Sequence, residues 1–273
     1  MLYRPAELIA FLKKIDHRPL KRLSQNFLID GNVVKKILKT AAIQPADTVL
    51  EIGPGAGVLT EALLEQKVKK VIAIEADKLL AQQLSRLGDK EVLVVYPTDF
   101  LKIDLAEILP AQKIKVVANL PYHIASQILI KLLYNHQHFN SLTLMLQKEM
   151  AQRLVALPCN KTYGQLTIQI DFFCEEKSSF PVSKNCFYPK PEVDSTMVHF
   201  KLRKEPLLKN KTAFLAFVKL AFQQRRKKIS STLSAQYPKT QIEDFLKQLG
   251  KEKSCRPEEL SCLDFINLFS LLS

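Results

Sequence analysis

The sequence predicts an α/β protein with a mostly parallel β-sheet, an antiparallel edge and a small all-helical C-terminal domain. From about residue 45, short apolar runs alternate with stretches whose apolar residues recur every three or four positions, as expected for a parallel sheet covered by helices on both faces. Two further β-like runs after residue 165 have no helix between them, which favours an antiparallel edge. Beyond residue 211 only helical patterns follow.

The strand-like runs justify the sheet in order along the chain. They are TVLEI (48–52), KVIAIE (70–75), VLVVY (92–96), KVVANL (115–120), SLTLMLQ (141–147), LTIQIDFF (166–173) and TMVHFKL (196–202). The polar segment 201–211 contains Pro206 and is interpreted as a linker. We therefore expect one domain over residues 1–203, with a basic N-terminal segment, and a helical domain over residues 204–273.

Charge is divided unevenly along the chain. Residues 1–39 carry nine Lys and Arg against three Asp and Glu, a net of +6, and residues 201–273 carry fifteen against seven, a net of +8. The middle, residues 40–200, has a net of −1. Basic flanks around a neutral body favour a polyanionic partner such as a nucleic acid, although two solvated basic faces would give the same pattern.

Composition also bears on the cellular compartment of the protein. No apolar stretch reaches the roughly 20 residues that span a bilayer, and no signal peptide is apparent, so no membrane association is expected. The five cysteines are scattered without a C-x-x-C pair, which indicates a reducing cytoplasm and neither a disulfide framework nor a metal site. The sequence shows no heptad repeat and no obvious strand suited to pairing with another chain, so a monomer is expected.

Glycines gather at one strand-to-helix turn. The chain has seven glycines, and Gly53, Gly55 and Gly57 follow strand TVLEI within five residues. Such a turn lets backbone approach a ligand closely. A dinucleotide fingerprint would place glycine where Val58 stands, and no G-K-[ST] follows, so a NAD site and a phosphate loop are both disfavoured.

Two acids follow the next strands. Glu75 ends the second strand, where a carboxylate can accept two ribose hydroxyls, and Asp99 lies past the third, placed to accept from an exocyclic amine. Each could instead be a simple strand-end cap. Together with the glycine turn they outline a Rossmann-like nucleoside site without a pyrophosphate, which fits S-adenosylmethionine better than NAD.

The fourth strand ends in Asn119-Leu120-Pro121-Tyr122, without a residue that could serve as a strong base. The Asn119 amide oxygen and the Pro121 carbonyl could each accept one N–H of an exocyclic amine, which would aim the nitrogen lone pair at a methyl group. Tyr122 offers a face for a base to stack on. The tetrapeptide therefore predicts a site that positions and polarises an amine, although Asn and Pro also end strands simply because they suit turns.

Together these residues resemble a known family. The sequence resembles the ribosomal RNA adenine N6,N6-dimethyltransferases of the KsgA/Dim type, which are class I S-adenosylmethionine-dependent methyltransferases. The resemblance covers nearly the whole chain. It rests on SQNFLID (24–30), VLEIGPGAGVLTEAL (49–63), VIAIEAD (71–77), ANLPYHIAS (118–126), QKEMAQRL (147–154), FYPKPEVDS (187–195) and AFQQRRKKISSTL (221–233).

The resemblance implies a role for each matching position. The methyl donor would contact Asn26, Leu28, Gly53, Glu75, Asp99 and Asn119, with Gln25 beside it. Asn119 and Pro121 would hold the target amine between Tyr122 and Phe187, one aromatic on each face of the adenine. His123 stands where relatives often have Asn; it could contact the RNA or tune the site, and a structural role is expected before either.

The resemblance also implies a substrate. The family transfers two methyl groups to each of two adjacent adenines in the 3′-terminal hairpin loop of small-subunit (16S) ribosomal RNA during ribosome biogenesis. The partner would be this RNA in an immature small subunit, because loop bases can be splayed into a pocket. The expected phosphate contacts are Lys13, Lys14, Lys21, Arg22, Arg225, Arg226, Lys227 and Lys228.

Three alternatives stay open. A relative that methylates a large-subunit adenine and confers macrolide resistance would share this build, and Leu120 with the P-x-P-x-V-x-S ending favours the small-subunit type. A non-catalytic RNA-binding assembly factor is disfavoured by the intact glycine turn and N-L-P-Y. A NAD-dependent oxidoreductase is disfavoured by Val58 and by the lack of a suitable Tyr/Lys or His/Asp pair.

Overall fold

The computed structural model describes residues 2–273, apart from the side chain of Lys21. The chain forms two compact units. The first combines the residues up to Ala151 with Glu175–Leu202, and the second combines Gln152–Cys174 with Arg203–Ser273. The first contains the sheet and the second is helical.

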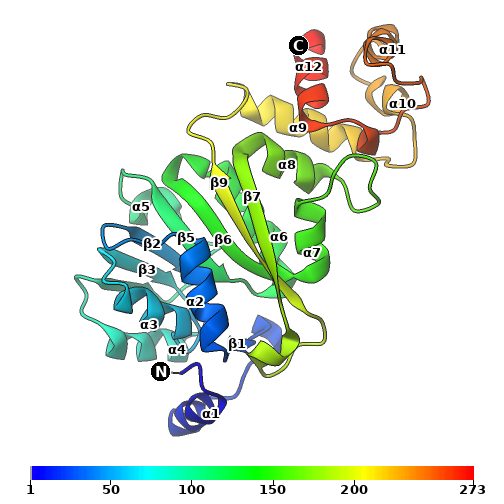
Figure 1. Ribbon diagram of the computed structural model, residues 1–273. Helices are drawn as coiled ribbons and strands as arrows, with labels where there is room; N and C mark the ends of the chain where they lie inside the picture. The colour runs from blue at the N-terminus through cyan, green and yellow to red at the C-terminus, as the bar shows by residue number, and fades with distance from the viewer. Residues whose placement is uncertain (1) are drawn as a thin grey trace. The chain divides into compact units, whose positions relative to one another are not determined.

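The first unit is built on a sheet of order β4-β3-β2-β5-β6-β9-β7 (Figure 1). Its strands are β2 (Thr48–Ile52), β3 (Lys70–Ile74), β4 (Leu93–Tyr96), β5 (Ile114–Asn119), β6 (Phe139–Gln147), β7 (Cys174–Val182) and β9 (Ser195–Leu202). From β4 to β6 neighbouring strands are parallel, and β9 pairs antiparallel with β6. All five residues of β2 are buried, as befits a strand covered on both faces.

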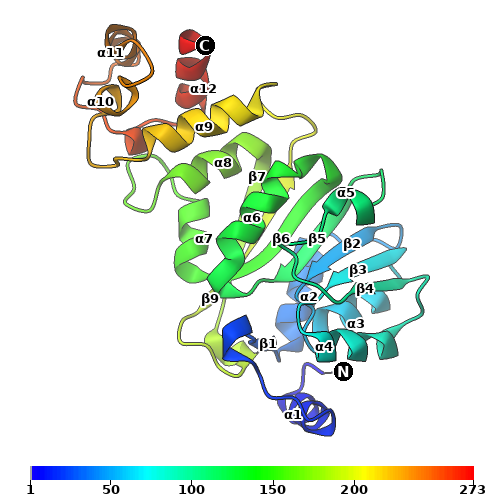
Figure 2. The ribbon, with the colours of Figure 1, turned by 180° about the vertical axis from the view of Figure 1, so that it is seen from behind.

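Helices alternate with the parallel strands along the chain. They are α2 (Gly31–Thr40), α3 (Val58–Glu65), α4 (Lys78–Leu84), α5 (Leu105–Ile108), α6 (Ala125–Tyr134) and α7 (Lys148–Leu154), which runs across the division between the two units. Helix α2 lies on one face of the sheet (Figure 1) and α6 on the other (Figure 2). Buried Val, Ile and Leu side chains from both layers form the core, as the apolar periodicity predicts.

The chain order of the sheet creates a crevice. From β2 the chain moves outward through β3 and β4, and then returns to place β5 on the other side of β2. Ligands of open α/β sheets bind outside the carboxyl ends of the strands at such a switch point. Gly53 follows β2 and Asn119 ends β5, so both lie at this position.

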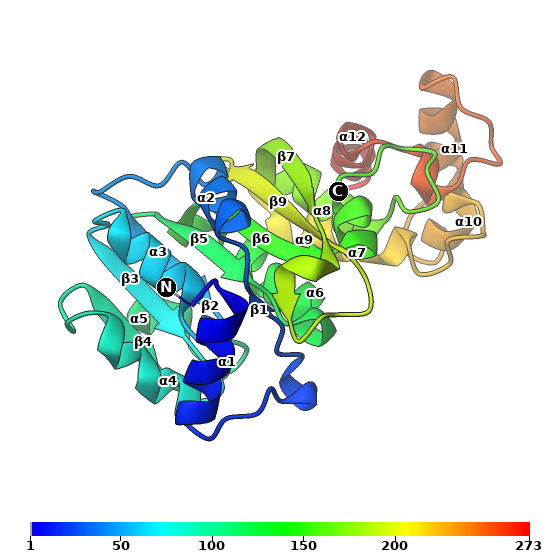
Figure 3. The same cartoon turned by 60° about the horizontal axis from the view of Figure 1, so that its bottom comes forward.

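The N-terminal segment packs against the same end of the sheet (Figure 3). Helix α1 (Pro5–Lys14) buries Leu8 and Leu12 in a cluster with Phe27 and Leu80. The chain then passes through η1 (Lys21–Leu23) to β1 (Phe27–Leu28), which pairs antiparallel with β8 (Phe187–Tyr188). Short turns η2 (Ser85–Leu87), η3 (Tyr122–Ile124), η4 (His136–His138) and η5 (Lys184–Cys186) complete the first unit.

The second unit is a bundle with an aromatic core. Its helices are α8 (Gln165–Phe173), α9 (Lys211–Ala221), α10 (Ile229–Leu233), α11 (Lys239–Gln248) and α12 (Cys262–Leu272), with the turn η6 (Pro257–Glu259). Phe172 stacks on Phe214 at 4.6 Å between ring centroids, and Phe217 packs against Phe265 and Phe269. The spacing of Phe214, Phe217, Val218 and Ala221 predicts one apolar helix face, and all four are buried in α9.

Two expectations need correction. Residues 166–173, which we expected to form a strand, lie in α8. This helix is buried on almost every side, so its apolar residues show no helical stripe and its β-branched residues imitate a strand. The expected boundary at 203/204 agrees with the structure within one residue, but residues 152–174 belong to the helical unit rather than to the first domain.

Candidate active site

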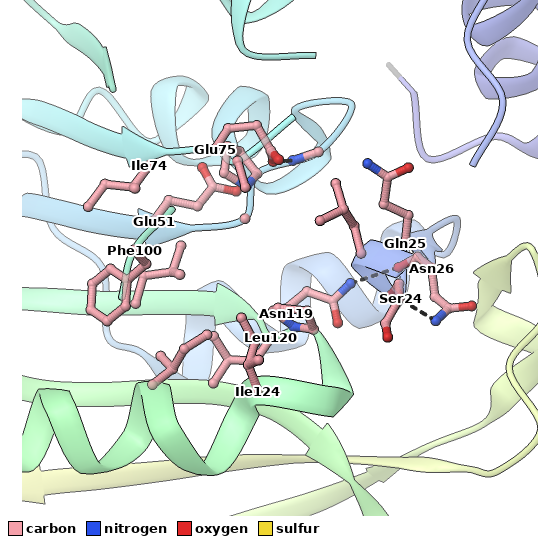
Figure 4. A pocket seen from close by; sticks show the side chains of 18 of the residues that line it. Ser24, Gln25, Asn26, Glu51, Ile74, Glu75, Phe100, Asn119, Leu120 and Ile124 are labelled. Carbon is pink, nitrogen blue, oxygen red and sulfur yellow. Dashed lines mark hydrogen bonds between the residues drawn. The ribbon is translucent and has the colours of Figure 1, made fainter. Parts of the chain in front are cut away.

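A cavity of about 200 Å³ opens at the switch point of the first unit (Figure 4). Its walls come from the segment before β1, the glycine turn, the end of β3, the loop after β4 and the residues that follow β5. The predicted donor-binding residues that line it are Gln25, Asn26, Leu28, Gly53, Gly55, Glu75, Asp99 and Asn119. Gly57 does not line it.

The glycine turn requires glycine for conformational reasons. Gly53, Gly55 and Gly57 have φ angles of 67°, 59° and 90°, in the left-handed region that side chains disfavour. A Cβ on Gly55 would lie 2.8 Å from the Phe27 ring. A Cβ on Gly57, the N-cap of α3, would lie 2.6 Å from Leu87. Gly57 therefore shapes the turn, whereas Gly53 and Gly55 expose backbone to the cavity.

Glu75 is held by backbone amides. Its Oε2 accepts from the Gly55 N–H at 2.8 Å and its Oε1 accepts from the Asp77 N–H at 2.8 Å. Burial raises the pKa of Glu75, and the two amide hydrogen bonds oppose that rise. Because a carboxylate oxygen has more than one lone-pair site, each oxygen can still accept from a ligand. The carboxyl is thus oriented to receive two neighbouring hydroxyl groups.

A third carboxyl, Glu51, lines the same cavity as Glu75 and Asp99, and the sequence reasoning did not assign it. The residue is 1% exposed and accepts a 2.6 Å hydrogen bond from Thr60 Oγ1. Burial raises the pKa of Glu51 to about 8, and the nearby Glu75 adds to the rise. Its signal in the sequence was an acid inside an otherwise apolar strand, TVLEI.

Asn119 is oriented by a contact from a distant part of the chain. Its Nδ2 donates to the main-chain oxygen of Asn26 at 2.9 Å. This bond fixes which end of the amide is the acceptor, so Oδ1 is left to accept from a ligand. The Pro121 carbonyl accepts a 3.3 Å bond from the Ile124 N–H and retains a second lone pair.

Tyr122 lines the cavity and its ring is fixed at the far end. Its hydroxyl lies 2.6 Å from Ser195 Oγ, at the start of β9. Burial raises the pKa of Tyr122, so the phenol stays neutral and serves as an aromatic wall. Ser195 was not singled out from the sequence, because only the fold brings it to this loop.

Phe187 lies outside the cavity wall. It pairs with Leu28 in the β1–β8 ladder and is 2% exposed within the hydrophobic core. The expected stacking face therefore points into the core in this structure, because the two-stranded sheet places it there. Its predicted contact with the target base stays a prediction that requires Phe187 to move.

The segment before β1 is tied to the sheet by polar side chains. Gln25 accepts from the Leu20 N–H at 2.8 Å and donates to Asp77 Oδ2 at 2.9 Å. The buried His17 Nε2 lies 2.8 Å from the same Asp77 oxygen. Burial tends to raise the pKa of Asp77, but the hydrogen bonds from His17 and Gln25 lower it overall. Gln25 thus positions this wall of the cavity.

His123 joins the wall to the acceptor loop. Its Nδ1 lies 2.9 Å from Ser24 Oγ, across a sequence separation of 99 residues. This contact agrees with the structural role expected for His123.

The predicted phosphate contacts fall into two groups on separate units. Lys13, Lys14 and Arg22 are exposed in the first unit, and Lys21 lies outside the side chains that the structure describes. Arg225, Arg226, Lys227 and Lys228 are exposed in the second unit. Arg225 is already engaged, because its Nη2 donates to the carbonyls of Lys161 and Tyr163 at 3.0 and 2.8 Å.

Within the described residues, no cluster of three or more His, Cys, Asp or Glu could hold a metal ion. No helix in the same residues is long and apolar enough to cross a membrane.

The family model for ribosomal RNA adenine dimethylases matches residues 17–273. The chain belongs to this family. The match starts at His17 and so includes the segment that closes the cavity as well as the sheet and the helical unit.

Relatives of the rRNA adenine dimethylase family match almost the full length. The chain is 40% identical to the ribosomal RNA small subunit methyltransferase A of Protochlamydia amoebophila, over 98% of this chain and 96% of the relative. The structure is similar to a dimethyladenosine transferase from Plasmodium falciparum, with a TM-score of 0.75 and 28% identity, covering 89% of this chain and 95% of that one.

A second solved structure, the 23S rRNA methyltransferase ErmE, gives a TM-score of 0.71 at 26% identity, over 90% of this chain and 99% of that chain. The predicted family, the class I methyltransferase fold and the enzyme class of rRNA adenine dimethyltransferase are therefore confirmed.

Proposed function

We propose that this protein transfers methyl groups from S-adenosylmethionine to N6 of two adjacent adenines in the 3′-terminal hairpin loop of small-subunit ribosomal RNA. The small-subunit assignment is supported by the name of the relative that is 40% identical over 98% of the chain. The observation that carries the chemistry is the Asn119 amide, which is anchored through Nδ2 and therefore presents Oδ1 at the cavity.

The residues present fit the methyl donor. Glu75 is oriented by the Gly55 and Asp77 amides to accept from a ribose diol. Asp99 lines the cavity, and its Oδ1 accepts from the Leu101 N–H at 2.9 Å, which turns the carboxyl toward an exocyclic amine. Gly53 and Gly55 line the cavity with bare backbone, which lets a ligand approach the chain closely. When bound, S-adenosylmethionine supplies an electrophilic methyl group.

The acceptor is positioned by neutral groups. Asn119 Oδ1 and the Pro121 carbonyl each accept a hydrogen bond from one N–H of the adenine amine, and Tyr122 stacks on the ring. Accepting both hydrogens directs the nitrogen lone pair out of the ring plane, which raises its nucleophilicity. No strong base is needed, because the methylated ammonium is acidic and loses its proton to solvent. The second transfer at the same nitrogen uses the same acceptors with one N–H fewer.

The RNA is held by charge. We assign phosphate contacts to Lys13, Lys14, Lys21 and Arg22 in the first unit and to Arg226, Lys227 and Lys228 in the second, with Arg225 serving first as a brace. A hairpin loop suits this scheme, because its bases can be flipped into a pocket while the phosphates are bound outside. We assign the protein to the cytoplasm, as a monomer acting on immature small subunits. The described residues contain no disulfide, which agrees with a reducing compartment.

The test is transfer to purified ribosomal particles that lack the modification. Small subunits incubated with the protein and S-adenosylmethionine should gain dimethyladenosine, detected by mass spectrometry of the digested RNA, and large subunits should gain none. The Asn119→Ala variant serves as the control for site-specific chemistry. Dimethyladenosine in the large subunit alone would overturn the proposal.

A specific observation favours one alternative, methylation of large-subunit ribosomal RNA. The ErmE structure is nearly as similar as the dimethyladenosine transferase, so the fold alone does not separate the two substrates. Methylation of large-subunit RNA in the same assay would favour it. An assembly factor without catalysis would bind small subunits and give no S-adenosylmethionine binding by calorimetry.

A further inference from the structure

Lys131 lies on α6 behind the donor cavity and makes an unusual set of contacts. Its ammonium donates to three backbone carbonyls, those of Phe100 at 2.8 Å, Leu101 at 3.1 Å and Ile103 at 2.5 Å. The three acceptors belong to one loop, between β4 and α5. Because an ammonium has three hydrogens, this loop engages the full donor capacity of the side chain.

The loop that Lys131 binds carries two residues of the cavity wall. Asp99 and Phe100 both line the cavity. Figure 4 shows the Phe100 side chain at its wall, and Phe100 is 4% exposed. The loop is not part of the sheet ladder, so its shape depends on local contacts. The Asp99 carboxylate accepts from the Leu101 N–H, and the Asp99 carbonyl accepts from the Lys102 N–H. Lys131 therefore binds the loop immediately after the Asp99 turn.

The Lys131 ammonium is subject to opposing influences. Burial lowers its pKa overall, and the carboxylates of Asp104 and Asp99 oppose that fall. Three backbone carbonyls converge on the ammonium as hydrogen-bond acceptors. The ammonium also lies 5.2 Å from the centroid of the Phe100 ring, on its face. An apolar side chain of similar length, such as Met, would leave the three carbonyls without a donor.

We propose that Lys131 is a positioning residue for the donor's adenine: it fixes the 99–103 loop so that Asp99 accepts from the 6-amino group while Phe100 walls the ring. The inference rests on the proposed function, because it takes the cavity to be the donor site. It adds a specificity determinant outside the cavity wall, since Lys131 does not itself line the cavity.

Lys131 also belongs to the helix that begins directly after the acceptor loop. Tyr122 lies in η3, which leads into α6, and Lys131 follows on the same helix. One helix therefore supports the wall that stacks the target base and the loop that reads the donor base. The loop that contacts the donor's base is therefore held by the same helix that follows the residues around the target base.

The experiment measures discrimination between two bases by calorimetry. The ligands are S-adenosylhomocysteine and its analogue in which a carbonyl oxygen replaces the 6-amino group. The unmodified protein should prefer the amino ligand by about tenfold or more, because Asp99 accepts from the amine and faces a second acceptor in the analogue. Lys131→Met should reduce the preference to about threefold or less, mainly by weakening the amino ligand.

Two further variants separate positioning from general damage. Lys102→Met makes the same change at an exposed lysine of the same loop and should keep the preference. Lys131→Gln can donate only two hydrogens and should give an intermediate preference, and it provides the test if Lys131→Met does not fold. Thermal unfolding of each variant is measured alongside, because a loss of stability alone does not alter the ratio between two ligands.

The outcomes are distinct. Lys131 variants that keep the preference, or that weaken both ligands equally, overturn the inference. Equal binding of the two ligands by the unmodified protein also overturns the inference, because Asp99 would then not accept from the 6-amino group. A protein that binds neither ligand contradicts the proposed function itself.

Discussion

The proposed donor half and the proposed acceptor half of the site are held in place in different ways. In the donor half, Glu75 is oriented by the amides of Gly55 and Asp77. The carboxylate and the two amides that orient it therefore come from one β-turn-α-β segment. In the acceptor half, Asn119 is oriented by Asn26, 93 residues away, and Tyr122 by Ser195, 73 residues away. The Glu75 part of the donor half is therefore built by local folding. Asn119 and Tyr122 take their positions only once distant segments have packed.

Asn119→Ala gives the largest expected effect and tests the acceptor half. Loss of the oriented amide should lower methyl transfer by at least about 10²–10³-fold, the range seen when one preorganised group at a reaction centre is removed. Binding of S-adenosylhomocysteine should be weakened but detectable by calorimetry. Transfer close to that of the parent would refute the role assigned to Asn119.

Glu75→Ala tests the donor half. The variant should raise the dissociation constant of the donor by about tenfold to 150-fold, because charge-assisted hydrogen bonds contribute about 1.5–3 kcal/mol. Calorimetry with S-adenosylhomocysteine measures it. Asp47→Ala, a change at an acid outside the cavity, is the control. An unchanged constant for Glu75→Ala would contradict the ribose assignment.

The basic residues of the second unit should act on RNA alone. Changing Arg226, Lys227 and Lys228 to Ala should reduce the slope of log binding constant against log salt by about 2–3, because each phosphate that the protein neutralises contributes nearly one unit to the slope. Filter binding to small-subunit RNA over a salt series measures the slope, and donor affinity should not change. Equal slopes for variant and parent would show that this cluster does not face the RNA.

Arg225→Ala separates structural from phosphate contact within the same cluster. Because Arg225 donates to the carbonyls of Lys161 and Tyr163, its loss should lower the melting temperature more than Arg226→Ala does. A larger effect on melting from Arg226→Ala would contradict the bracing role.

Glu51→Gln should change the pH dependence of stability. With a folded pKa of about 8 and an ordinary value of 4.5, the folded protein holds a proton that the unfolded chain releases between these values. Stability therefore falls as pH rises through this window, by at most about 1.4 kcal/mol per pH unit for one group. Urea unfolding at pH 5 and pH 8 should show a smaller fall for the variant. An identical fall in both proteins would show that Glu51 ionises normally.

The sequence predicted the donor half more completely than the acceptor half, and the reason is physical. Gly53, Glu75 and Asp99 follow consecutive strands, and parallel strands bring their carboxyl ends to one edge, so chain order alone places them together. The strands from β2 to β6 agree with their predicted runs within two residues, and TVLEI matches β2 at both ends. The edge strand β7 was not predicted.

What sequence reasoning missed depends on packing. Ser195 and Lys131 act through contacts that no local pattern announces, and Phe187 is buried by the β1–β8 pairing, which spans about 160 residues of chain. The strand expected at 166–173 is a helix because burial on almost every side hides helical periodicity. Local sequence patterns thus indicate helices, strands and the binding residues at strand ends. They do not indicate the distant residues that hold those binding residues in place.

The wall formed by residues 23–28 has a practical consequence for protein engineering. The sheet with its connecting helices looks like a self-sufficient module, yet one side of its ligand chamber is supplied from outside the sheet. A shortened version that starts at α2 would retain the architecture and lose both that side and the brace on Asn119. Minimal catalytic fragments of this protein must therefore begin well upstream of the first sheet strand.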